Sequence, residues 1–339
     1  MEYKLKSVAL HITNECSANC PQCYFTKENQ IKCEGNLDTL KKIALELMNA
    51  GVEEINLVGG DPAEYSHIQE LVEYLSTLGF RVPILSNTHN YKNTTIEKIA
   101  PYVSSLEGTF HAPTALEHNR FNRTSNSYEM MVENLKIYDL LRSSDQNLGA
   151  VLNVMNHNYN RLYEIIEKLL EQGLSLDYVL IQRIGLYGRA EGNEREKILV
   201  EKLAVAFEQI AKINKELKVE SVMVDAFPLC LIPKEYHEYL DKCDWGYHTA
   251  SLDMNGIMTR CAVANHNGSN LLGNILETPV TEIWQTSPTL INFRNKDYLR
   301  EECQVCDLLS KCGGGCPISC GNNELSDDSF IKELKRQKN

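Results

Sequence analysis

Twelve cysteines, gathered near the two ends of the chain, restrict what this sequence can fold into more than any other feature does. Four of them lie between Cys16 and Cys33, none follows until Cys230, and eight lie between Cys230 and Cys320. The first residues contain charged side chains and no long apolar run, so they do not resemble an export signal. We therefore expect a cytoplasmic protein, in which clustered cysteines indicate metal sites rather than disulfides.

The composition argues against two broad classes of protein. The chain has 339 residues and a formal net charge of −12, so a protein that grips the phosphates of a nucleic acid is not expected. No apolar run reaches the ~20 residues that a membrane-spanning helix needs. With 43% hydrophobic and 24% charged residues, the chain has the composition of a soluble globular protein, with neither nucleic acid nor membrane as a partner.

Up to about residue 217, short β-branched runs alternate with amphipathic segments, a pattern that indicates parallel strands joined by helices. Six such units are fewer than the eight of a closed barrel, so we expect an α/β fold with a partial (β/α)6 TIM-like barrel at residues 1–217. The expected strands are Val8–Ile12, Glu54–Val58, Val82–Leu85, Ser105–Phe110, Ala150–Met155 and Tyr178–Gln182. The expected helices are Leu37–Ala50, Ile68–Leu78, Thr95–Ala100, Tyr128–Leu141, Leu162–Glu171 and Lys197–Ile213.

A change in composition near residue 218 predicts a second, smaller domain at residues 218–325. This stretch is rich in Gly, Asn and Cys and has few long periodic helices. Within it, Asn255-Gly256 is a strong two-residue signal for a β-hairpin, flanked by residues 251–254 and 257–260. We expect a loop-rich, cysteine-rich domain with one hairpin, followed by a charged tail at residues 326–339 that is helical or frayed.

The first cysteine group has a spacing that suits a catalytic iron–sulfur site. Cys16, Cys20 and Cys23 form a C-x3-C-x2-C loop directly after the first expected strand. Three thiolates can hold three irons of a [4Fe–4S] cube and leave the fourth iron without a protein ligand. An open coordination position is typical of a catalytic metal centre. A zinc knuckle is the alternative, with Cys33 as a distant fourth ligand.

This motif, followed by the aromatic Tyr24, resembles the signature of the radical S-adenosylmethionine (SAM) superfamily. The resemblance implies that Cys16, Cys20 and Cys23 hold a [4Fe–4S] cluster whose open iron binds SAM. It further implies reductive cleavage of SAM to a 5′-deoxyadenosyl radical, and a ferredoxin- or flavodoxin-type reductant. The same resemblance assigns SAM contacts to positions that follow the expected strands: Tyr24, Gly59, Gly60, Asp61, Pro62, Ser86, Asn87, Arg123, Asn153 and Ile184.

Five of these positions also have support from the chemistry of the residues themselves. Gly59-Gly60-Asp61-Pro62 resembles the family's GGEP motif, with glycines that allow close approach to a ligand and with Asp in place of Glu. Arg123, with Arg120 close behind, is the candidate to pair with the SAM carboxylate, since a planar guanidinium suits that role. A solvated loop arginine is the alternative at either position.

The second cysteine group resembles the SPASM domain, which carries two auxiliary [4Fe–4S] clusters. The spacing is C-x12-G-x4-C, then C-x2-C-x5-C-x3-C, then a further Cys after a short interval. Two closed cubes need eight thiolates, which Cys230 completes. The resemblance implies one cluster held by Cys230, Cys243, Cys261 and Cys316 and a second held by Cys303, Cys306, Cys312 and Cys320. Zinc ribbons are the alternative, and Cys33 is left spare.

Radical SAM enzymes with this domain commonly modify peptides or proteins by crosslinking, oxidation or epimerisation. The resemblance therefore implies a peptide or protein substrate. Ala262, where sulfatase-maturing relatives carry an Asp, argues against that activity. The short segment before the first strand leaves no room for a leader-binding domain, so a separate leader-binding protein is a possible partner. A small-molecule cofactor or tetrapyrrole precursor is the alternative substrate, and a non-catalytic electron carrier is a remote one.

Overall fold

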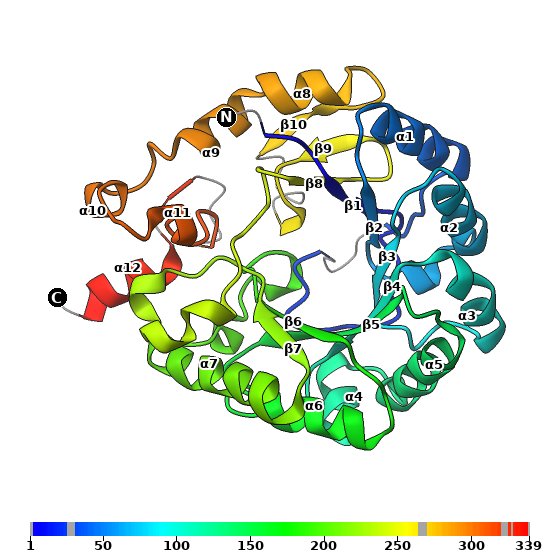
Figure 1. Cartoon of the computed structure of the whole chain (residues 1–339), viewed down its shortest axis with the longest axis horizontal. Coiled ribbons are helices and arrows are strands. Elements are labelled where there is room, and N and C mark those ends of the chain that lie inside the picture. The colour runs from blue at the N-terminus through cyan, green and yellow to red at the C-terminus, as the bar shows by residue number, and fades with distance from the viewer. Residues whose placement is uncertain (1–2, 26–30, 264–269, 320–324, 327, 338–339) are drawn as a thin grey trace.

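The computed structural model describes residues 3–25, 31–263, 270–319, 325–326 and 328–337, and it contains one curved sheet with helices around its outer face (Figure 1). The sheet has ten strands in the order β10-β9-β8-β1-β2-β3-β4-β5-β6-β7. Strands β1 to β7 are parallel, and β8 joins β1 in parallel. The strands are β1 (Ser7–His11), β2 (Glu54–Val58), β3 (Pro83–Ser86), β4 (Ser105–Phe110), β5 (Asn147–Val154), β6 (Tyr178–Arg183), β7 (Glu220–Met223), β8 (Thr249–Leu252), β9 (Ile257–Thr259) and β10 (Leu271–Asn274).

Helices α1 to α7 cover the outer face of the parallel strands, and α8 to α12 continue the ring on the side of the C-terminus (Figure 1). The α-helices are α1 (Leu37–Asn49), α2 (Ile68–Thr77), α3 (Asn93–Ile99), α4 (Ala115–Asn122), α5 (Ser127–Leu141), α6 (Leu162–Glu171), α7 (Leu203–Lys212), α8 (Val280–Thr286), α9 (Pro288–Asn295), α10 (Glu301–Gln304), α11 (Leu309–Cys312) and α12 (Ser329–Gln337). Short 3-10 segments are η1 (Pro62–Glu64), η2 (Ala100–Tyr102), η3 (Gly188–Ala190), η4 (Glu194–Glu196), η5 (Val200–Lys202), η7 (Leu229–Leu231) and η8 (Lys234–Tyr239), and Ile213–Leu217 forms a π turn.

Helix α1 shows how the sequence produces this arrangement. The side chain of Asn36 accepts a hydrogen bond from the N–H of Thr39 and so caps the first turn. The apolar positions recur at helical spacing and are fully buried against the sheet: Leu40, Ile43, Ala44 and Leu47. The helix predicted over Leu37–Ala50 is confirmed to within one residue, and α2, α6 and α7 likewise bury apolar residues, although without a side-chain cap.

The structure confirms the predicted open α/β barrel, with three differences in its elements. The strands Glu54–Val58 and Ser105–Phe110 and the helix Leu162–Glu171 have the predicted bounds. The helix predicted over Lys197–Ile213 was wrong in its first part, because Glu194–Glu196 and Val200–Lys202 form separate 3-10 turns and α7 begins only at Leu203. Strand β7 and helix α4 were missed, since four strand residues and a helix without a strong apolar stripe give little periodicity.

The predicted hairpin forms, but it belongs to the same sheet as the barrel. Strands β8 and β9 are antiparallel, and Gly256 in the turn has the positive φ of +85° that favours glycine. Strand β8 also pairs with β1 from Ser7↔Thr249 to Leu10↔Leu252. The cysteine-rich region is therefore built onto the edge of the barrel, and the domain boundary near residue 218 stays a prediction.

The C-terminal tail, expected to be helical or frayed, docks on the barrel as α12. Phe330 is only 1% exposed and stacks on Phe227 at 5.4 Å between ring centroids. Asp328 is fully buried and accepts from Nη1 of Arg183, at the end of β6, at 2.7 Å. The same carboxylate accepts from the N–H of Cys316 at 2.7 Å. The tail thus connects the barrel to the cysteine-rich region.

A buried carboxyl lies in the barrel interior. Glu107 on β4 is 5% exposed, and its Oε1 accepts from the hydroxyl of Tyr178 on β6 at 2.6 Å. Gly149 on the intervening strand leaves space for this contact, because a Cβ there would lie 2.5 Å from the Tyr178 ring. Burial raises the pKa of Glu107 to about 7, against the opposing hydrogen bonds from Tyr178 and Ser105.

This carboxyl predicts a pH dependence of stability. Between pH 4.5 and about 7 the folded protein holds a proton on Glu107 that the unfolded chain lacks, so the free energy of unfolding falls as pH rises through this window. Glu107→Gln keeps an acceptor for Tyr178 and removes this part of the slope. Anaerobic urea unfolding at pH 5 and pH 8 is expected to show the variant gaining stability relative to the wild type at pH 8. An identical slope in the two proteins would contradict this account.

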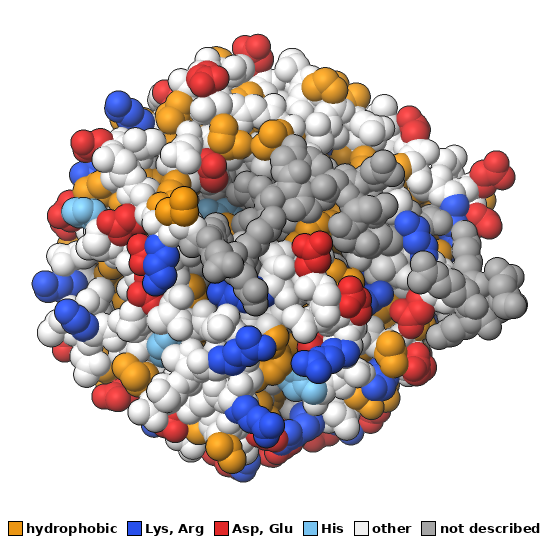
Figure 2. Space-filling model, turned by 180° about the vertical axis from the view of Figure 1, so that it is seen from behind, with side chains coloured by type: hydrophobic (Ala, Val, Ile, Leu, Met, Phe, Trp, Pro, Cys, Tyr) orange, Lys and Arg blue, Asp and Glu red, His pale blue; other side chains and the backbone are white. Residues whose placement is uncertain are grey.

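The surface mixes charges of both signs. Viewed from behind, acidic and basic side chains are interspersed, and several Lys and Arg side chains gather in the lower half of that face (Figure 2). Within the described residues, no helix combines the length and apolar character required to cross a membrane.

Candidate active site

The three cysteines of the C-x3-C-x2-C motif lie on the loop that follows β1. Asn14 fixes the start of this loop, because its Nδ2 donates to the carbonyl of Ile31 and its Oδ1 accepts from the N–H of Cys33, both at 2.7 Å. Cys33 is exposed, and its Sγ lies 4.0 Å from the Sδ of Met254. The backbone of Cys33 therefore supports the cysteine loop, while its thiol points to the hairpin turn.

The thiols of Cys16, Cys20 and Cys23 lie close enough to influence one another. Burial raises the pKa of Cys16 to about 12, and Asp61 and Cys23 add to the effect. Burial also raises the pKa of Cys20, with further contributions from Cys23 and Cys16. Buried thiols that would repel one another as thiolates fit a cationic metal group lying between them.

Gly59 and Gly60 pack closely against the backbone of the cysteine loop. A Cβ at Gly59 would lie 2.4 Å from the carbonyl oxygen of Thr13, and a Cβ at Gly60 would lie 2.1 Å from that of Glu15. The N–H of Gly60 donates to Thr13 O at 2.8 Å. The two glycines thus allow the loop after β2 to hold the cysteine loop in place. The sequence predicted a close approach to SAM, and that contact stays a prediction.

Gly60→Ala is expected to displace the cysteine loop. The added methyl group meets rigid backbone at Glu15, and the position has no positive φ that would strain alanine by itself. We expect loss of about four irons per chain and about 100-fold slower SAM cleavage. Gly173→Ala is the control, since no atom lies within 4 Å of its Cβ although its φ is +89°. Equal iron contents in the two variants would refute this role for Gly60.

Asp61 forms a buried polar network beneath Cys16. Its Oδ1 accepts from the hydroxyl of Ser86 and from the N–H of Ala63, where it caps η1 ahead of Pro62. Burial raises the pKa of Asp61 to about 6. Asn87 donates from Nδ2 to Sγ of Cys16 at 3.3 Å. Ser86 is thus engaged with Asp61, while Asn87 touches the thiol directly, and their predicted SAM contacts stay predictions.

A histidine next to Cys20 was missed by sequence reasoning. His111, directly after β4, places Nε2 3.9 Å from the Sγ of Cys20 and 3.3 Å from Nε2 of Gln22. Its ring stacks on His118 at 5.2 Å, and burial holds its pKa well below its usual value. One signal could have found it: His111 directly follows a predicted strand, and functional residues of parallel barrels lie at the carboxyl ends of the strands.

Arg123 lies beside the cysteine loop and does not line the cavity that Tyr24, Asn153 and Ile184 border. It ends α4 with a positive φ of 56° and is exposed. The neighbouring Asn122 accepts through its carbonyl from the N–H of Asn19 at 2.9 Å. The turn therefore lies next to residues 16–23. Among the described residues, the guanidinium of Arg123 makes no hydrogen bond or ion pair, and its pairing with SAM stays a prediction.

A cavity of about 200 Å³ joins the barrel interior to the cysteine-rich region. Of the predicted SAM-binding residues, Tyr24, Asn153 and Ile184 line it. From the cysteine-rich region, its walls include Cys243, Cys261, Cys312 and Cys316. Burial, and then the nearby Cys23 and Cys261, raise the pKa of Tyr24. Tyr24 therefore lies between the two cysteine groups.

Three cysteines of the second group surround a buried arginine. Arg260 is 2% exposed, lies 4.3 Å above the ring of Phe293, and has an Nη2 without a hydrogen-bond partner among the described residues. Burial opposes its charge, but the thiols of Cys261, Cys243 and Cys316 outweigh that effect and raise its pKa. The buried guanidinium, which has an unpaired donor and lies beside three thiols, fits an iron–sulfur cluster there, because the thiolate ligands give such a cluster a net negative charge.

The other cysteines of the second group lie nearer to α10 and α11. Cys230 on η7 and Cys306 are exposed, and Cys303 and Cys312 are partly buried. Cys320 falls outside the described residues. Within the described part of the chain, no three Cys, His, Asp or Glu side chains converge as tightly as the ligands of a single metal ion. The thiolates of a four-iron cube are spread more widely than such a shell.

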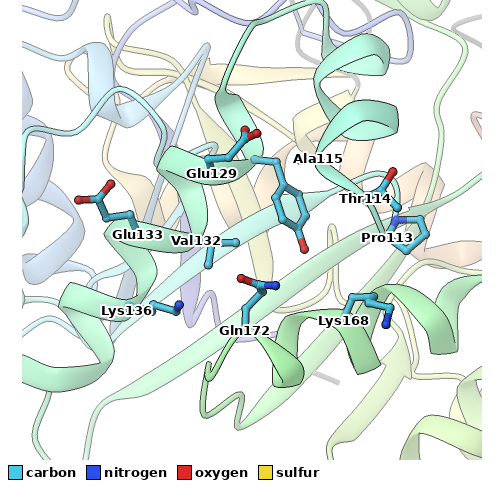
Figure 3. Close-up of a pocket in the computed structure, with 10 residues that line it drawn as sticks. Pro113, Thr114, Ala115, Glu129, Val132, Glu133, Lys136, Lys168 and Gln172 are labelled. Carbon is cyan, nitrogen blue, oxygen red and sulfur yellow. The ribbon is translucent and has the colours of Figure 1, made fainter.

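A separate hollow lies on the outer surface between α4, α5 and α6 (Figure 3). Its volume is about 460 Å³, and its walls include Lys136, Lys168 and Gln172. None of the predicted cysteine ligands or SAM-contacting residues lines it. The cavity of about 200 Å³, where Tyr24, Asn153 and Ile184 lie together with cysteines of the second group, is therefore the candidate active site.

Comparison with known families agrees with the two cysteine motifs. Residues 10–139 match the radical SAM superfamily, and residues 243–307 match SPASM, an iron–sulfur cluster-binding domain. The chain therefore contains a radical SAM domain and a SPASM domain. It is accordingly an enzyme that binds SAM and iron–sulfur clusters, and the zinc alternatives for both cysteine groups are not supported.

The curated relatives include two kinds of enzyme. A protein described as PqqA peptide cyclase from Bradyrhizobium diazoefficiens is 23% identical over 328 residues, which cover 91% of this chain and 80% of that protein. An AdoMet-dependent heme synthase from Methanosarcina barkeri is 20% identical over 324 residues, covering 91% of this chain and 90% of the synthase.

Solved structures share the fold. Streptococcus suis SuiB bound to its precursor peptide SuiA superposes with a TM-score of 0.77 at 15% identity, covering 96% of this chain and 76% of SuiB. The enzyme anSMEcpe with bound AdoMet has a TM-score of 0.70 at 11% identity, covering 97% of this chain and 95% of that one. At these identities the comparison establishes the open barrel with its C-terminal extension.

Proposed function

We propose that this enzyme modifies a peptide or protein by removing a hydrogen atom from one of its residues. When bound, SAM and the cluster at Cys16, Cys20 and Cys23 would supply a 5′-deoxyadenosyl radical. The observation that carries the proposal is the single cavity lined both by Tyr24 of the cysteine loop and by cysteines of the SPASM domain. A substrate held there lies between the site of hydrogen removal and an electron acceptor.

The relatives support a peptide rather than another substrate class. Two of the curated relatives, from Bradyrhizobium diazoefficiens and Rhizobium meliloti, carry the description PqqA peptide cyclase. SuiB, which has the same fold, is described with its precursor peptide bound. The outcome would be a crosslink, an oxidation or an epimerisation, and two auxiliary [4Fe–4S] clusters would take up or return electrons.

The residues proposed to bind SAM are assigned by their place in the fold. Tyr24, Asn153 and Ile184 would contact SAM from the cavity wall, and Gly59, Gly60, Asp61, Pro62, Ser86, Asn87 and Arg123 from the loops around Cys16. We further propose a cytoplasmic protein that receives electrons from a ferredoxin or flavodoxin and receives its peptide with a separate leader-binding protein. The radical SAM core domain would span residues 1–217 and the cysteine-rich domain residues 218–325, with the tail at 326–339.

Asp225 is the carboxylate that can accept a proton in this cavity. It lines the wall near Tyr24 and Cys243, and burial raises its pKa to about 6. Its Oδ2 accepts from the N–H of Arg183 at 2.7 Å, which fixes its position. Ala262 lines the same cavity and has no proton-accepting group. We therefore assign to Asp225 the role of proton acceptor, which an acidic residue directly after Cys261 could otherwise fill.

Asp225→Asn is expected to lower product formation about 100-fold, the scale of a lost proton acceptor. The amide oxygen still accepts from Arg183, so the fold and SAM cleavage without substrate are expected to stay within about twofold of wild type. Product and 5′-deoxyadenosine are both measured by mass spectrometry. An equal fall in both quantities would show that Asp225 supports the structure rather than proton transfer.

A tetrapyrrole substrate is the second candidate. The observation that favours it is the heme synthase relative, 90% of which is covered by this chain. The cavity is compatible with either class, because its walls mix apolar residues such as Trp245 and Phe293 with the polar residues Asn153 and Gln182.

The two candidates are separated by one assay. The reconstituted enzyme, SAM and dithionite are incubated either with the product of a short open reading frame beside its gene or with an iron coproporphyrin. We expect the peptide to stimulate 5′-deoxyadenosine formation and to be modified, detected as loss of two hydrogens for a crosslink or as uptake of one deuterium from D2O for an epimerisation. Modification of the porphyrin with an unchanged peptide would overturn the peptide proposal.

A further inference from the structure

Cys230 lies beside Cys312, a cysteine that the family pattern places in a different cluster. The N–H of Leu229, the residue before Cys230 on η7, donates to Sγ of Cys312 at 3.4 Å. The thiol of Cys312 in turn lies 3.9 Å from the carbonyl oxygen of Phe227. Residues 227–230 therefore wrap around the thiol of Cys312 at the end of α11.

Cys303 shares this neighbourhood. Burial raises the pKa of Cys230, with Cys312 next in importance and Cys303 also contributing, while Arg300 opposes the shift. Arg300 donates from Nε to Sγ of Cys303 at 3.3 Å. Cys306 is joined to Cys303 by a backbone hydrogen bond at 3.2 Å. Arg300 thus lies near the thiols of Cys230 and Cys303. Together with Cys306 and Cys312, these thiols come from η7 and from the region of α10 and α11.

The remaining described cysteines form a separate set around Arg260. Burial raises the pKa of Cys243, and Cys316 is the next contributor, while Arg260 lowers it. Cys261 and Cys316 pack together with Ile318 in a small apolar cluster. Cys243, Cys261 and Cys316 all line the cavity; of the other set, Cys312 reaches its wall, whereas Cys230 does not contribute to its described walls.

We propose that Cys230 is a ligand of the second auxiliary cluster, together with Cys303, Cys306 and Cys312. The first cluster is then held by Cys243, Cys261 and Cys316, three thiolates that line the cavity. This inference rests on the proposed pair of auxiliary clusters and departs from the ligand sets that the family resemblance implies.

The partition has a chemical consequence at the cavity. A cube held by three of these thiolates has a fourth iron without a ligand among the described residues. Cys261 and Cys316 line the cavity together with Ala262 and Ser319. That iron is completed either by Cys320 or by a donor atom that enters the cavity. In both cases Cys320 is not a ligand of the second cluster.

The test compares spectra in a chain that lacks the SAM-binding cluster. Cys16, Cys20 and Cys23 are replaced by Ala, which is expected to leave about eight irons per chain in two cubes. Cys243→Ala and Cys303→Ala in this background give reference electron paramagnetic resonance spectra for loss of the first and second cluster. Cys230→Ala is expected to match the Cys303→Ala spectrum. A match to Cys243→Ala, or no change, would overturn the proposed partition.

Two further variants complete the design. Cys230→Ser offers an oxygen ligand and is expected to shift only the second-cluster signal, which covers the case in which the Ala variant fails to fold. Cys320→Ala is expected to leave the second-cluster signal intact, and its loss would contradict the partition. A background chain with about four irons would instead refute the pair of auxiliary clusters, so the two failures are distinguishable.

Discussion

Replacing Cys16, Cys20 and Cys23 together by Ala is expected to abolish formation of 5′-deoxyadenosine from SAM. The three thiols lie on one loop, and contacts from Gly60 and Asn87 hold that loop in place. Without them the SAM-binding iron–sulfur cluster has no protein ligands. The measurement is chromatographic detection of 5′-deoxyadenosine after anaerobic incubation with SAM and dithionite.

The control for this variant is Cys33→Ala. Cys33 supports the cysteine loop through its backbone, while its exposed thiol faces Met254. We expect the control to cleave SAM at a rate within about twofold of wild type, since a surface thiol contributes little packing. Cleavage retained in the triple variant, or lost in the control, would mean that the wrong thiols have been assigned to the cluster.

Asp328→Ala is expected to have the largest effect on stability. It removes the carboxylate that pairs with Arg183 and accepts from the N–H groups of Cys316 and Phe330. The Arg183 side chain is 8% exposed, so its charge is left buried without its main partner. Breaking such a buried pair costs about 3 to 5 kcal/mol, which anaerobic urea unfolding measures.

The same variant is expected to disturb the first auxiliary cluster, because Asp328 fixes the backbone of Cys316. Glu53→Gln is the matched control, since it breaks the exposed Lys4–Glu53 pair. That change is expected to have no measurable effect on unfolding or iron content, because solvent screens exposed pairs. Similar unfolding midpoints for Asp328→Ala and the control would show that the tail does not stabilise the barrel.

The local part of the fold could be predicted from the sequence because it depends on periodicity. The buried face of α1 and the bounds of β2 and β4 follow from apolar residues recurring at helix or strand spacing. The contacts of the tail could not be predicted in this way. Whether residues 326–339 are frayed or docked depends on Arg183, which is distant in sequence and presents a charge for Asp328.

The candidate site shows the same division. Local cysteine spacing predicted a radical SAM domain and a SPASM domain, and the family comparison confirmed the two domains. The contacts of His111 and the place of Asp225 in the cavity arise where separate strand ends converge, which spacing along the chain does not encode. The neighbourhood of Cys230 depends on how η7 packs against α11, and the family pattern alone placed it in the other cluster.

The most direct test of the account is iron and sulfide per chain after anaerobic reconstitution. The account predicts about twelve irons in the wild type, from three [4Fe–4S] cubes, and about eight in the Cys16, Cys20, Cys23 triple variant, from the two cubes that remain. About four irons in the wild type would contradict it, since the cysteines that line the cavity opposite Tyr24 would then hold no cluster.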